Sequence, residues 1–388
     1  MLGKSGQAVT AVPVTVAGDH YSVEINADGM VTTARPELTA ADGDVLITPG
    51  FLDLQINGFA GIDFNSPGLT AETLDHALEA MLRTGVTACL PTLITAPVDE
   101  LEERFRALVA ATGDSRYAEQ MVVGFHLEGP FLSSLESYRG CHPAECMCPA
   151  EVADFDRLQA AADGRIRLVT VAPEVTGALA LIEHLCGQGV VAALGHTAAD
   201  GPTIAAAAAR GARLSTHLGN GAPAMLHRFD NVITHQLCDD RLMASFIADG
   251  YHLAPAILRS YLRAKSLSRS ILVTDAVAGA AAPPGDYRLG RVAVRRGAEP
   301  VITLPGTQLL AGSALTLDWA ARNLLAWTEF GFDEIFTMAR TNPARLLGQP
   351  DPAPSPGRPA DLVRWVMTDS GPEVESTRLG GTVIASRS

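Results

Sequence analysis

Long apolar runs are missing from this 388-residue sequence. A membrane-spanning helix needs about 18 consecutive apolar residues, and no such run occurs. The N-terminal stretch, MLGKSGQAVTAVPVTVAGDH, also lacks the long apolar segment of a signal peptide. We therefore expect a cytoplasmic protein that has no membrane partner.

Basic charge is scarce as well. The 29 Lys and Arg residues are outnumbered by 43 Asp and Glu, and the net charge of −14 is spread over many segments. Nucleic acids and anionic membranes attract a basic patch or stripe, which this chain does not have. A small molecule is the expected partner.

Cysteines are few and scattered, which excludes a small secreted scaffold held by disulfides. We expect reduced thiols. Cys146-x-Cys148 resembles half of a zinc site, but it has no second pair nearby, so a loop is the expected structure. The six cysteines are Cys89, Cys141, Cys146, Cys148, Cys186 and Cys238.

The N-terminal part of the chain has a β pattern. Short segments (AVTAVPVTV, YSVEIN and MVTTA) are broken by Gly and Asp turns and show no helical periodicity. We interpret residues 1–47 as the first part of a small β domain.

From Val45 onward, eight short apolar runs alternate with Ala- and Leu-rich amphipathic stretches, a pattern typical of βα units with a parallel sheet. The runs are VLITPGFLDLQI, VTACLPTLI, MVVGFHLEGP, IRLVTVAPE, VVAALGHT, ARLSTHL, LMASFIADGYH and SILVTDAVA. The predicted helices are 71–85, 99–112, 177–189, 200–211 and 254–266. Eight units close a (β/α)₈ TIM-type barrel, which we place at residues 48–348.

Two further segments complete the predicted architecture. Alternating residues around Arg-Gly turns predict a β excursion near 286–310, before helices resume at 314–331 and 332–348. The stretch 349–388 is again strand-like and should complete the small β domain. The barrel would then be inserted in a small β-sandwich formed by both ends of the chain.

Polar residues end most of the apolar runs. In a barrel the active site lies at the C-terminal ends of the strands, so a converging set of His, Glu and Asp indicates metal-assisted hydrolysis. Taken singly, each residue has a structural explanation, such as a hydrogen-bonded core histidine or a turn cap. Their shared position at the ends of predicted strands favours a functional site. The residues are Gln55, Asn57, His126, Glu128, His196, His217, Asp249, His252 and Asp275.

These motifs resemble one known family, the N-acetylglucosamine-6-phosphate deacetylases of the amidohydrolase superfamily. The matching segments are PGFLDLQINGFAGIDFN, FHLEGPFL, LGHTAAD, STHLGN, IADGYH, LVTDA, LAGSALTL, TNPARLLG and PADLV. They follow the family's order through most of the chain. The resemblance implies deacetylation of an N-acetylated amino sugar phosphate, with N-acetylglucosamine 6-phosphate as the expected substrate.

The resemblance also implies that Glu128, His196 and His217 bind one divalent metal and leave an open position for water. Two-metal members of the superfamily carry His-x-His after the first strand, where this chain has Gln55 and Asn57. Neutral amides are poor ligands, so we expect a single ion. Zinc is the expected metal, while iron, manganese and cobalt also tolerate these ligands.

Other roles follow from the same resemblance. Asp275 matches the general acid/base, which would accept a proton from water and pass it to the departing amine. His142 matches a histidine that polarises the substrate carbonyl, and His252 one that holds the sugar. The alternative for each of these two histidines is that it is an ordinary loop residue without a role in the site.

The resemblance implies that Asn220, Gly221 and Arg228 bind the phosphate of the substrate. It also implies a homodimer in which Arg228 reaches the phosphate from the neighbouring subunit. One departure weakens the match: the family has an aromatic residue and Ala where this chain has Gly219 and Gly221. The deacetylase assignment is therefore firmer than the identity of the sugar. The implied contacts are Cys141, Asn220, Gly221, Arg228, Leu310, Ala311 and Gly312.

Two alternatives remain open. The same site would also serve another amidohydrolase reaction, on a different N-acetylhexosamine phosphate or on an N-acyl amino acid. A non-catalytic barrel that binds a sugar phosphate is the more distant alternative, and the joint presence of three ligands and Asp275 argues against it.

Overall fold

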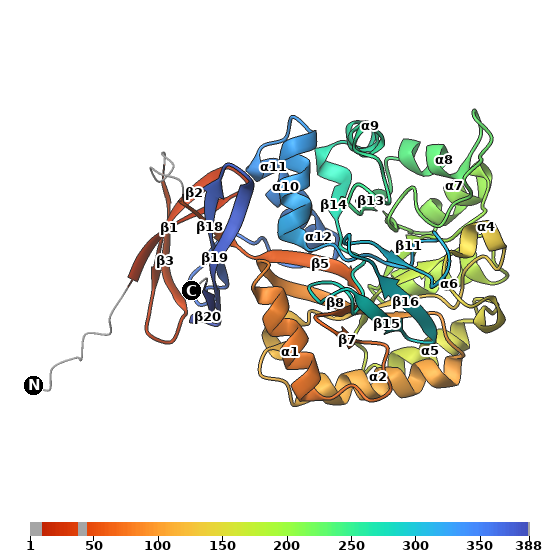
Figure 1. Ribbon diagram of the computed structural model, residues 1–388, viewed down its shortest axis with the longest axis horizontal. Helices are drawn as coiled ribbons and strands as arrows, with labels where there is room; N and C mark the ends of the chain where they lie inside the picture. The colour runs from red at the N-terminus through yellow and green to blue at the C-terminus, as the bar shows by residue number, and fades with distance from the viewer. Residues whose placement is uncertain (1–9, 38–44, 387–388) are drawn as a thin grey trace, which may run out of the picture.

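Eight parallel strands form a barrel in the computed structural model, which describes residues 10–37 and 45–386 (Figure 1). The first strand meets the segment that follows the last one through a parallel bridge between Ile56 and Ala276. All eight runs predicted from the sequence contribute a strand. The barrel strands are β5 (Phe51–Ile56), β8 (Val86–Ile94), β9 (Phe125–Glu128), β10 (Ile166–Val171), β11 (Val191–Leu194), β12 (Leu214–Ser215), β13 (Met243–Phe246) and β14 (Ser270–Leu272).

Helices lie outside the barrel, and their apolar faces pack against the strands. The predicted helices are present, with 332–348 divided into α11, η3 and α12, while α3, α4, α5 and α8 lie outside the predicted segments. No helix of the described segments is long and apolar enough to cross a lipid bilayer. The helices are α1 (Ala71–Leu82), α2 (Val98–Gly113), α3 (Ala118–Met121), α4 (Glu136–Arg139), α5 (Val152–Ala161), α6 (Ala178–Gly187), α7 (Gly201–Ala209), α8 (Val232–Cys238), α9 (Pro255–Lys265), α10 (Leu317–Trp327), α11 (Phe332–Phe336) and α12 (Asn342–Leu346). Short 3₁₀ turns are η1 (Ala144–Cys146) and η2 (Leu267–Arg269), and η3 (Thr337–Thr341) is π-helical.

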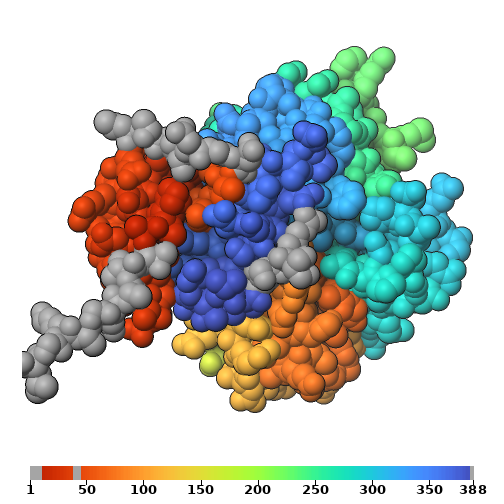
Figure 2. All heavy atoms as spheres, turned by 60° about the vertical axis from the view of Figure 1, so that its left-hand side comes forward, coloured from red at the N-terminus to blue at the C-terminus, as the bar shows by residue number. Residues whose placement is uncertain are grey.

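Both ends of the chain build a smaller lobe beside the barrel. Figure 2 shows the red N-terminal and blue C-terminal segments in contact on one face. One sheet has the order β1-β2-β3, and the other has the order β20-β19-β18-β4. This arrangement confirms the predicted insertion. The strands are β1 (Thr10–Val16), β2 (Asp19–Ile25), β3 (Val31–Glu37), β4 (Val45–Pro49), β18 (Leu362–Thr368), β19 (Gly371–Leu379) and β20 (Thr382–Ser386).

The prediction of one barrel strand over 45–56 is wrong, because the run contains two strands. β4 pairs with β18 in the small lobe, and the barrel begins only with β5. Gly50 separates them at a point of close packing, where an added Cβ would lie 2.2 Å from the Cγ2 of Thr87. Trp365 of β18 fixes the junction, since its buried indole N–H donates to Thr48 Oγ1 at 2.9 Å.

The predicted β excursion follows the eighth barrel strand. β15 (Gly285–Leu289), β16 (Val292–Arg296) and β17 (Ile302–Thr303) form an antiparallel sheet with its own small core. A two-stranded ribbon, β6 (Gly58–Phe59) and β7 (Ile62–Asp63), lies after the first barrel strand. The excursion brings Leu310 and Gly312 to the rim of the cavity described below.

Candidate active site

A cavity opens where the barrel strands end. Its volume is about 490 Å³, and its lining includes Glu128, His196, His217 and Asp275. Glu128 is the last residue of β9, while the other three follow β11, β12 and β14 within three residues. The sequence prediction that strand ends bring these side chains together is confirmed.

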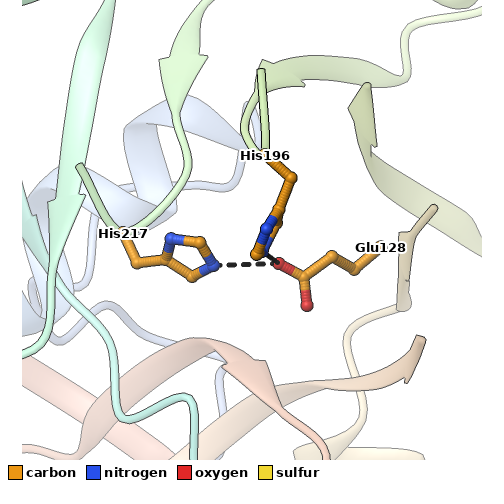
Figure 3. A group of neighbouring side chains, drawn as sticks. All are labelled: Glu128, His196 and His217. Atoms are coloured by element: carbon orange, nitrogen blue, oxygen red, sulfur yellow. Dashed lines mark hydrogen bonds and ion pairs between the residues drawn. The ribbon is translucent and has the colours of Figure 1, made fainter. Parts of the chain in front are cut away.

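Three of these side chains converge on one point. The Nε2 atoms of His217 and His196 lie 3.0 Å and 3.5 Å from the same carboxylate oxygen, Oε1 of Glu128 (Figure 3). One ligand atom from each residue lies within 4.8 Å of the others, and all three residues are buried. Within residues 10–37 and 45–386 this is the one group of His, Cys, Asp and Glu that can hold a metal ion. Cys146 and Cys148 belong to no such group, and Cys146 ends the η1 turn in a loop region.

The neighbours of the histidines fit a metal centre. Nδ1 of His196 lies 2.9 Å from the carbonyl oxygen of Tyr138 and can donate to it, so the Nε2 lone pair remains free for a metal. Nδ1 of His217 is buried without a partner among the described residues, and its Nε2 faces Glu128. Burial raises the pKa of Glu128, but hydrogen bonds from His196 and His217, when these rings are protonated at Nε2, outweigh it and lower the pKa well below its usual value. A carboxylate and two imidazoles thus face one another with their ligand atoms inward.

The backbone is strained at these positions. His196, His217 and Asp275 adopt positive φ angles of 49°, 28° and 50°, although none of them is glycine. Such conformations cost roughly 1–3 kcal/mol each and persist where the surrounding structure imposes them. All three occur just after a barrel strand, where the turn directs the side chain toward the cavity.

Gly221 explains part of the departure from the resembled family. Its φ is +58°, and an added Cβ would lie 2.6 Å from Nδ1 of His196. A side chain in this conformation would displace the ring of His196. Asn220, its neighbour, lines the cavity and donates from Nδ2 to the carbonyl of His217 at 3.0 Å.

Asp275 is held by two amides. Its Oδ1 accepts from Nδ2 of Asn57 at 2.7 Å and from Nε2 of Gln55 at 3.2 Å. Burial, followed by the negative charge of Glu128, raises the pKa of Asp275 to about 6, and the bond from Asn57 opposes that rise. Sequence reasoning treated Gln55 and Asn57 only as absent ligands and missed their role as donors.

A buried layer of polar side chains lies beneath the site. His126 is fully buried, does not line the cavity, and lies within 2.8 Å of Thr170 Oγ1 and 3.3 Å of Thr92 Oγ1, so the core-histidine interpretation applies to it. Asp53, which the sequence did not single out, accepts from Thr274 Oγ1 at 2.5 Å. Burial raises the pKa of Asp53 to about 7.

His142 lies next to the three converging residues. Its Nδ1 is 2.8 Å from Thr95 Oγ1, and its Nε2 is 3.9 Å from Oε2 of Glu128. Burial, followed by the charge of His196, lowers the pKa of His142 to about 3, so its ring is neutral. Cys141 also lines the cavity, and burial raises the pKa of its thiol to about 12.

On the opposite wall, His252 is oriented by a carboxylate. Nδ1 of His252 lies 2.6 Å from Oδ2 of Asp249, whose Oδ1 accepts from the backbone N–H groups of Tyr251 and His252. Asp249 itself does not line the cavity, whereas His252 does. Of the two polar residues predicted at the end of this strand, His252 therefore lies in the cavity and Asp249 lies behind it.

Two expected substrate contacts lie elsewhere. Ala311 is buried behind the rim in the core of the β excursion. Arg228 is exposed, and its guanidinium lies 4.7 Å from the centre of the Phe229 ring rather than in the cavity of its own chain. Gly221, Leu310 and Gly312 do line the cavity.

Comparisons with known proteins agree with this arrangement. The model of the Amidohydrolase family matches residues 46–384. An N-acetylgalactosamine-6-phosphate deacetylase from Escherichia coli O157:H7 is 33% identical over 368 residues, 94% of each chain. An N-acetylglucosamine-6-phosphate deacetylase from Bacillus subtilis (strain 168) is 33% identical over 86% of this chain and 85% of its own. A solved structure of a mutant N-acetyl-D-glucosamine-6-phosphate deacetylase from Mycobacterium smegmatis, in complex with N-acetyl-D-glucosamine-6-phosphate, has a TM-score of 0.87 and 28% identity, covering 98% of this chain and 100% of that chain.

Proposed function

We propose that the chain, which belongs to the amidohydrolase family, removes the acetyl group from an N-acetylated hexosamine 6-phosphate. N-acetylglucosamine 6-phosphate is the expected substrate. The observation that carries the proposal is the convergence of Glu128, His196 and His217 beside Asp275, in a chain one-third identical to enzymes named for this reaction.

Glu128, His196 and His217 would hold one divalent ion, with zinc the expected metal and iron, manganese and cobalt as alternatives. Such an ion supplies Lewis acidity, which polarises the amide carbonyl and lowers the pKa of water. A second ion is not expected, because Gln55 and Asn57 direct their amide nitrogens at Asp275.

Asp275 is the proposed proton carrier. Its carboxylate would accept a proton from the attacking water and deliver it to the amide nitrogen, since an unprotonated amine is a very poor leaving group. The amides of Asn57 and Gln55 donate to Oδ1 and leave Oδ2 without a hydrogen-bond partner in the described structure. That oxygen is the one available for proton transfer.

His142 and His252 would bind the substrate on opposite sides. If Thr95 donates to Nδ1 of the neutral His142 ring, Nε2 carries the proton and can donate to the amide oxygen. The carboxylate of Asp249 fixes the other ring by its bond to Nδ1, so Nε2 of His252 is left for a sugar hydroxyl.

The phosphate group of the substrate would be bound partly by residues from the neighbouring subunit. Asn220 and Gly221 line the cavity, while Arg228 lies on an exposed loop with Met225 and Phe229, which are 89% and 77% exposed. Exposed apolar side chains that gather on one loop are typical of protein interfaces. We propose a homodimer in which Arg228 completes the neighbouring site. The six free thiols agree with a cytoplasmic location.

The sugar epimer has two candidates, because relatives named for N-acetylgalactosamine 6-phosphate and N-acetylglucosamine 6-phosphate are equally identical to this chain. The test is acetate release from both phosphates, from their unphosphorylated sugars and from an N-acetyl amino acid. We expect turnover of at least one sugar phosphate at a rate that far exceeds the others. Turnover of the N-acetyl amino acid alone would refute the substrate class, and no turnover by metal-loaded protein would support a binding barrel.

Arg228→Ala tests the phosphate contact. A charge-assisted pair contributes roughly 1.5–3 kcal/mol, so kcat/KM for the phosphorylated sugar should fall about 10- to 150-fold. The unphosphorylated sugar should be affected little. An equal loss on both substrates would show that Arg228 does not bind phosphate.

A further inference from the structure

A second cavity lies between the small lobe and the barrel, at the opposite end of the barrel from the active site. Its volume is about 220 Å³, and its lining includes Arg340 of η3, Pro49 of β4, Ser355, Arg358 and Asp361. Pro49 immediately precedes the first barrel strand, whereas the active-site residues follow the strand ends. Figure 1 shows the small lobe on the side where β5 enters the barrel.

Arg340 is a half-buried residue, and part of its guanidinium is buried without a counter-charge among the described residues. Its Nε and Nη1 atoms are buried, and they have no hydrogen-bond partner in the described parts of the chain. No carboxylate of those residues approaches the guanidinium within 4.0 Å, the limit for an ion pair. A buried N–H group that lacks a partner destabilises a fold by roughly 1–3 kcal/mol, and more if it is charged. The position therefore calls for an acceptor.

The nearby acid does not meet this need. Asp361 lines the same cavity and acts on Arg340 through its charge, but its Oδ1 accepts from the backbone N–H of Gly380 at 2.7 Å. Burial lowers the pKa of Arg340 to about 10 despite that charge. The guanidinium stays protonated at neutral pH and lacks a direct partner.

A second arginine contributes to the same cavity. Arg358 lines it, is exposed, and forms no ion pair with any described residue. Its backbone is fixed to the small lobe, since its carbonyl accepts from Val31 N–H at 2.8 Å. Two guanidinium groups and one carboxylate give the cavity a net positive charge.

We propose that this cavity binds a small oxyanion, the phosphate group of inorganic phosphate or of a small phosphate ester, between Arg340 and Arg358. The planar guanidinium forks match the geometry of phosphate oxygens. Ser355 lines the cavity and offers a hydroxyl donor. The volume lies below the range of about 300–1,000 Å³ that accommodates drug-sized ligands, so a small anion fits better than a large one.

Such a ligand would connect two parts of the fold. Arg340 belongs to η3, which packs against β5 of the barrel, while Arg358 lies in the Pro-rich segment before β18 of the small lobe. An anion that contacts both would hold the lobe against the barrel. π-helical segments are frequent at functional sites, and Arg340 lies in one.

The experiment is equilibrium dialysis with radiolabelled inorganic phosphate at constant ionic strength. The proteins are the full-length wild type, Arg340→Met, Arg358→Ala and Arg228→Ala, the last of which weakens the proposed active-site contact. We expect Arg340→Met and Arg358→Ala to lose affinity for phosphate at this site by roughly tenfold or more. Arg228→Ala should keep the site, so the failure of either proposal can be recognised separately.

Arg364→Ala is the matched control, because it removes a cation from β18 outside the cavity and should leave phosphate binding unchanged. Competition by glucosamine 6-phosphate distinguishes the sources: stronger displacement than by unlabelled phosphate indicates an ester, and equal or weaker displacement indicates free phosphate. Unchanged binding in both Arg340→Met and Arg358→Ala would overturn the proposal.

A crystal of the wild type soaked in selenate covers the case in which Arg340→Met does not fold. Selenate is a tetrahedral oxyanion that can be located by its anomalous scattering. A peak between Arg340 and Arg358 is expected, and a cavity without one would also overturn the proposal.

Discussion

Replacement of Asn57 by Leu tests how the active-site carboxylate is held. Nδ2 of Asn57 donates to Oδ1 of Asp275 at 2.7 Å, and its own Oδ1 is buried without a partner in the described structure. Asn57→Leu keeps the approximate volume and removes only that one bond. A hydrogen bond to a charged group contributes roughly 1.5–3 kcal/mol, and a factor of ten in rate corresponds to about 1.4 kcal/mol. We therefore expect kcat to fall by about 10- to 150-fold.

The assay is steady-state acetate release by the metal-loaded enzyme, combined with elemental analysis of each preparation. Gln55→Met is the comparison, because Gln55 donates to the same oxygen at the longer distance of 3.2 Å and its loss should cost less. Metal content should stay normal in both variants. A kcat within twofold of the wild type for Asn57→Leu would refute the reasoning, and a parallel loss of metal and activity would mean that Asn57 supports the metal site.

Three further predictions follow from the same geometry. Protein purified without added metal should contain about one equivalent of metal per chain, and two tightly held equivalents would contradict the single-ion proposal. His196→Ala or His217→Ala should lose metal and activity together. Asp275→Asn should lower turnover by roughly 10²- to 10⁴-fold at normal metal content, whereas near-normal turnover would exclude Asp275 as the proton carrier. Burial raises the pKa of Asp53 from 3.8 to about 7, so its contribution to stability is complete below the lower value and is lost as pH rises through the higher one. Between pH 4 and 8 the wild type should lose up to roughly 4 kcal/mol of unfolding free energy relative to Asp53→Asn, measured as the difference between their denaturation midpoints at each pH; a constant difference would show that Asp53 is not protonated in the folded state.

The sequence alone determined the barrel and the rim on which the candidate site lies. Parallel strands are buried on both faces, so each appears as a short apolar run, and the helices between them carry a separate amphipathic pattern. Because all strands point the same way, the residue that ends each run must lie at one rim. This is why the sequence places Glu128, His196, His217 and Asp275 among the residues of one rim, from which the family resemblance then selects them.

Contacts between distant segments were decided by the tertiary structure. Val45–Pro49 has the same apolar character as the strand that follows it, and only its pairing with Leu362–Thr368 assigns it to the small lobe. A strand's composition does not specify its partner, since hydrogen bonds join backbones whatever the side chains are. The exact division at Gly50, rather than the predicted boundary between residues 47 and 48, therefore required the tertiary structure.

The roles of the supporting residues also required coordinates. Asn57 and Asp275 are 218 positions apart, and nothing in the sequence indicates that the amide of one donates to the carboxylate of the other. Arg340 likewise looks like an ordinary helix residue in the sequence. It stands out only because folding buries its Nε and Nη1 atoms without a hydrogen-bond partner among the described residues. A residue's type and position along a strand are local properties that the sequence records, whereas hydrogen-bond partners and desolvation depend on which distant segments pack together.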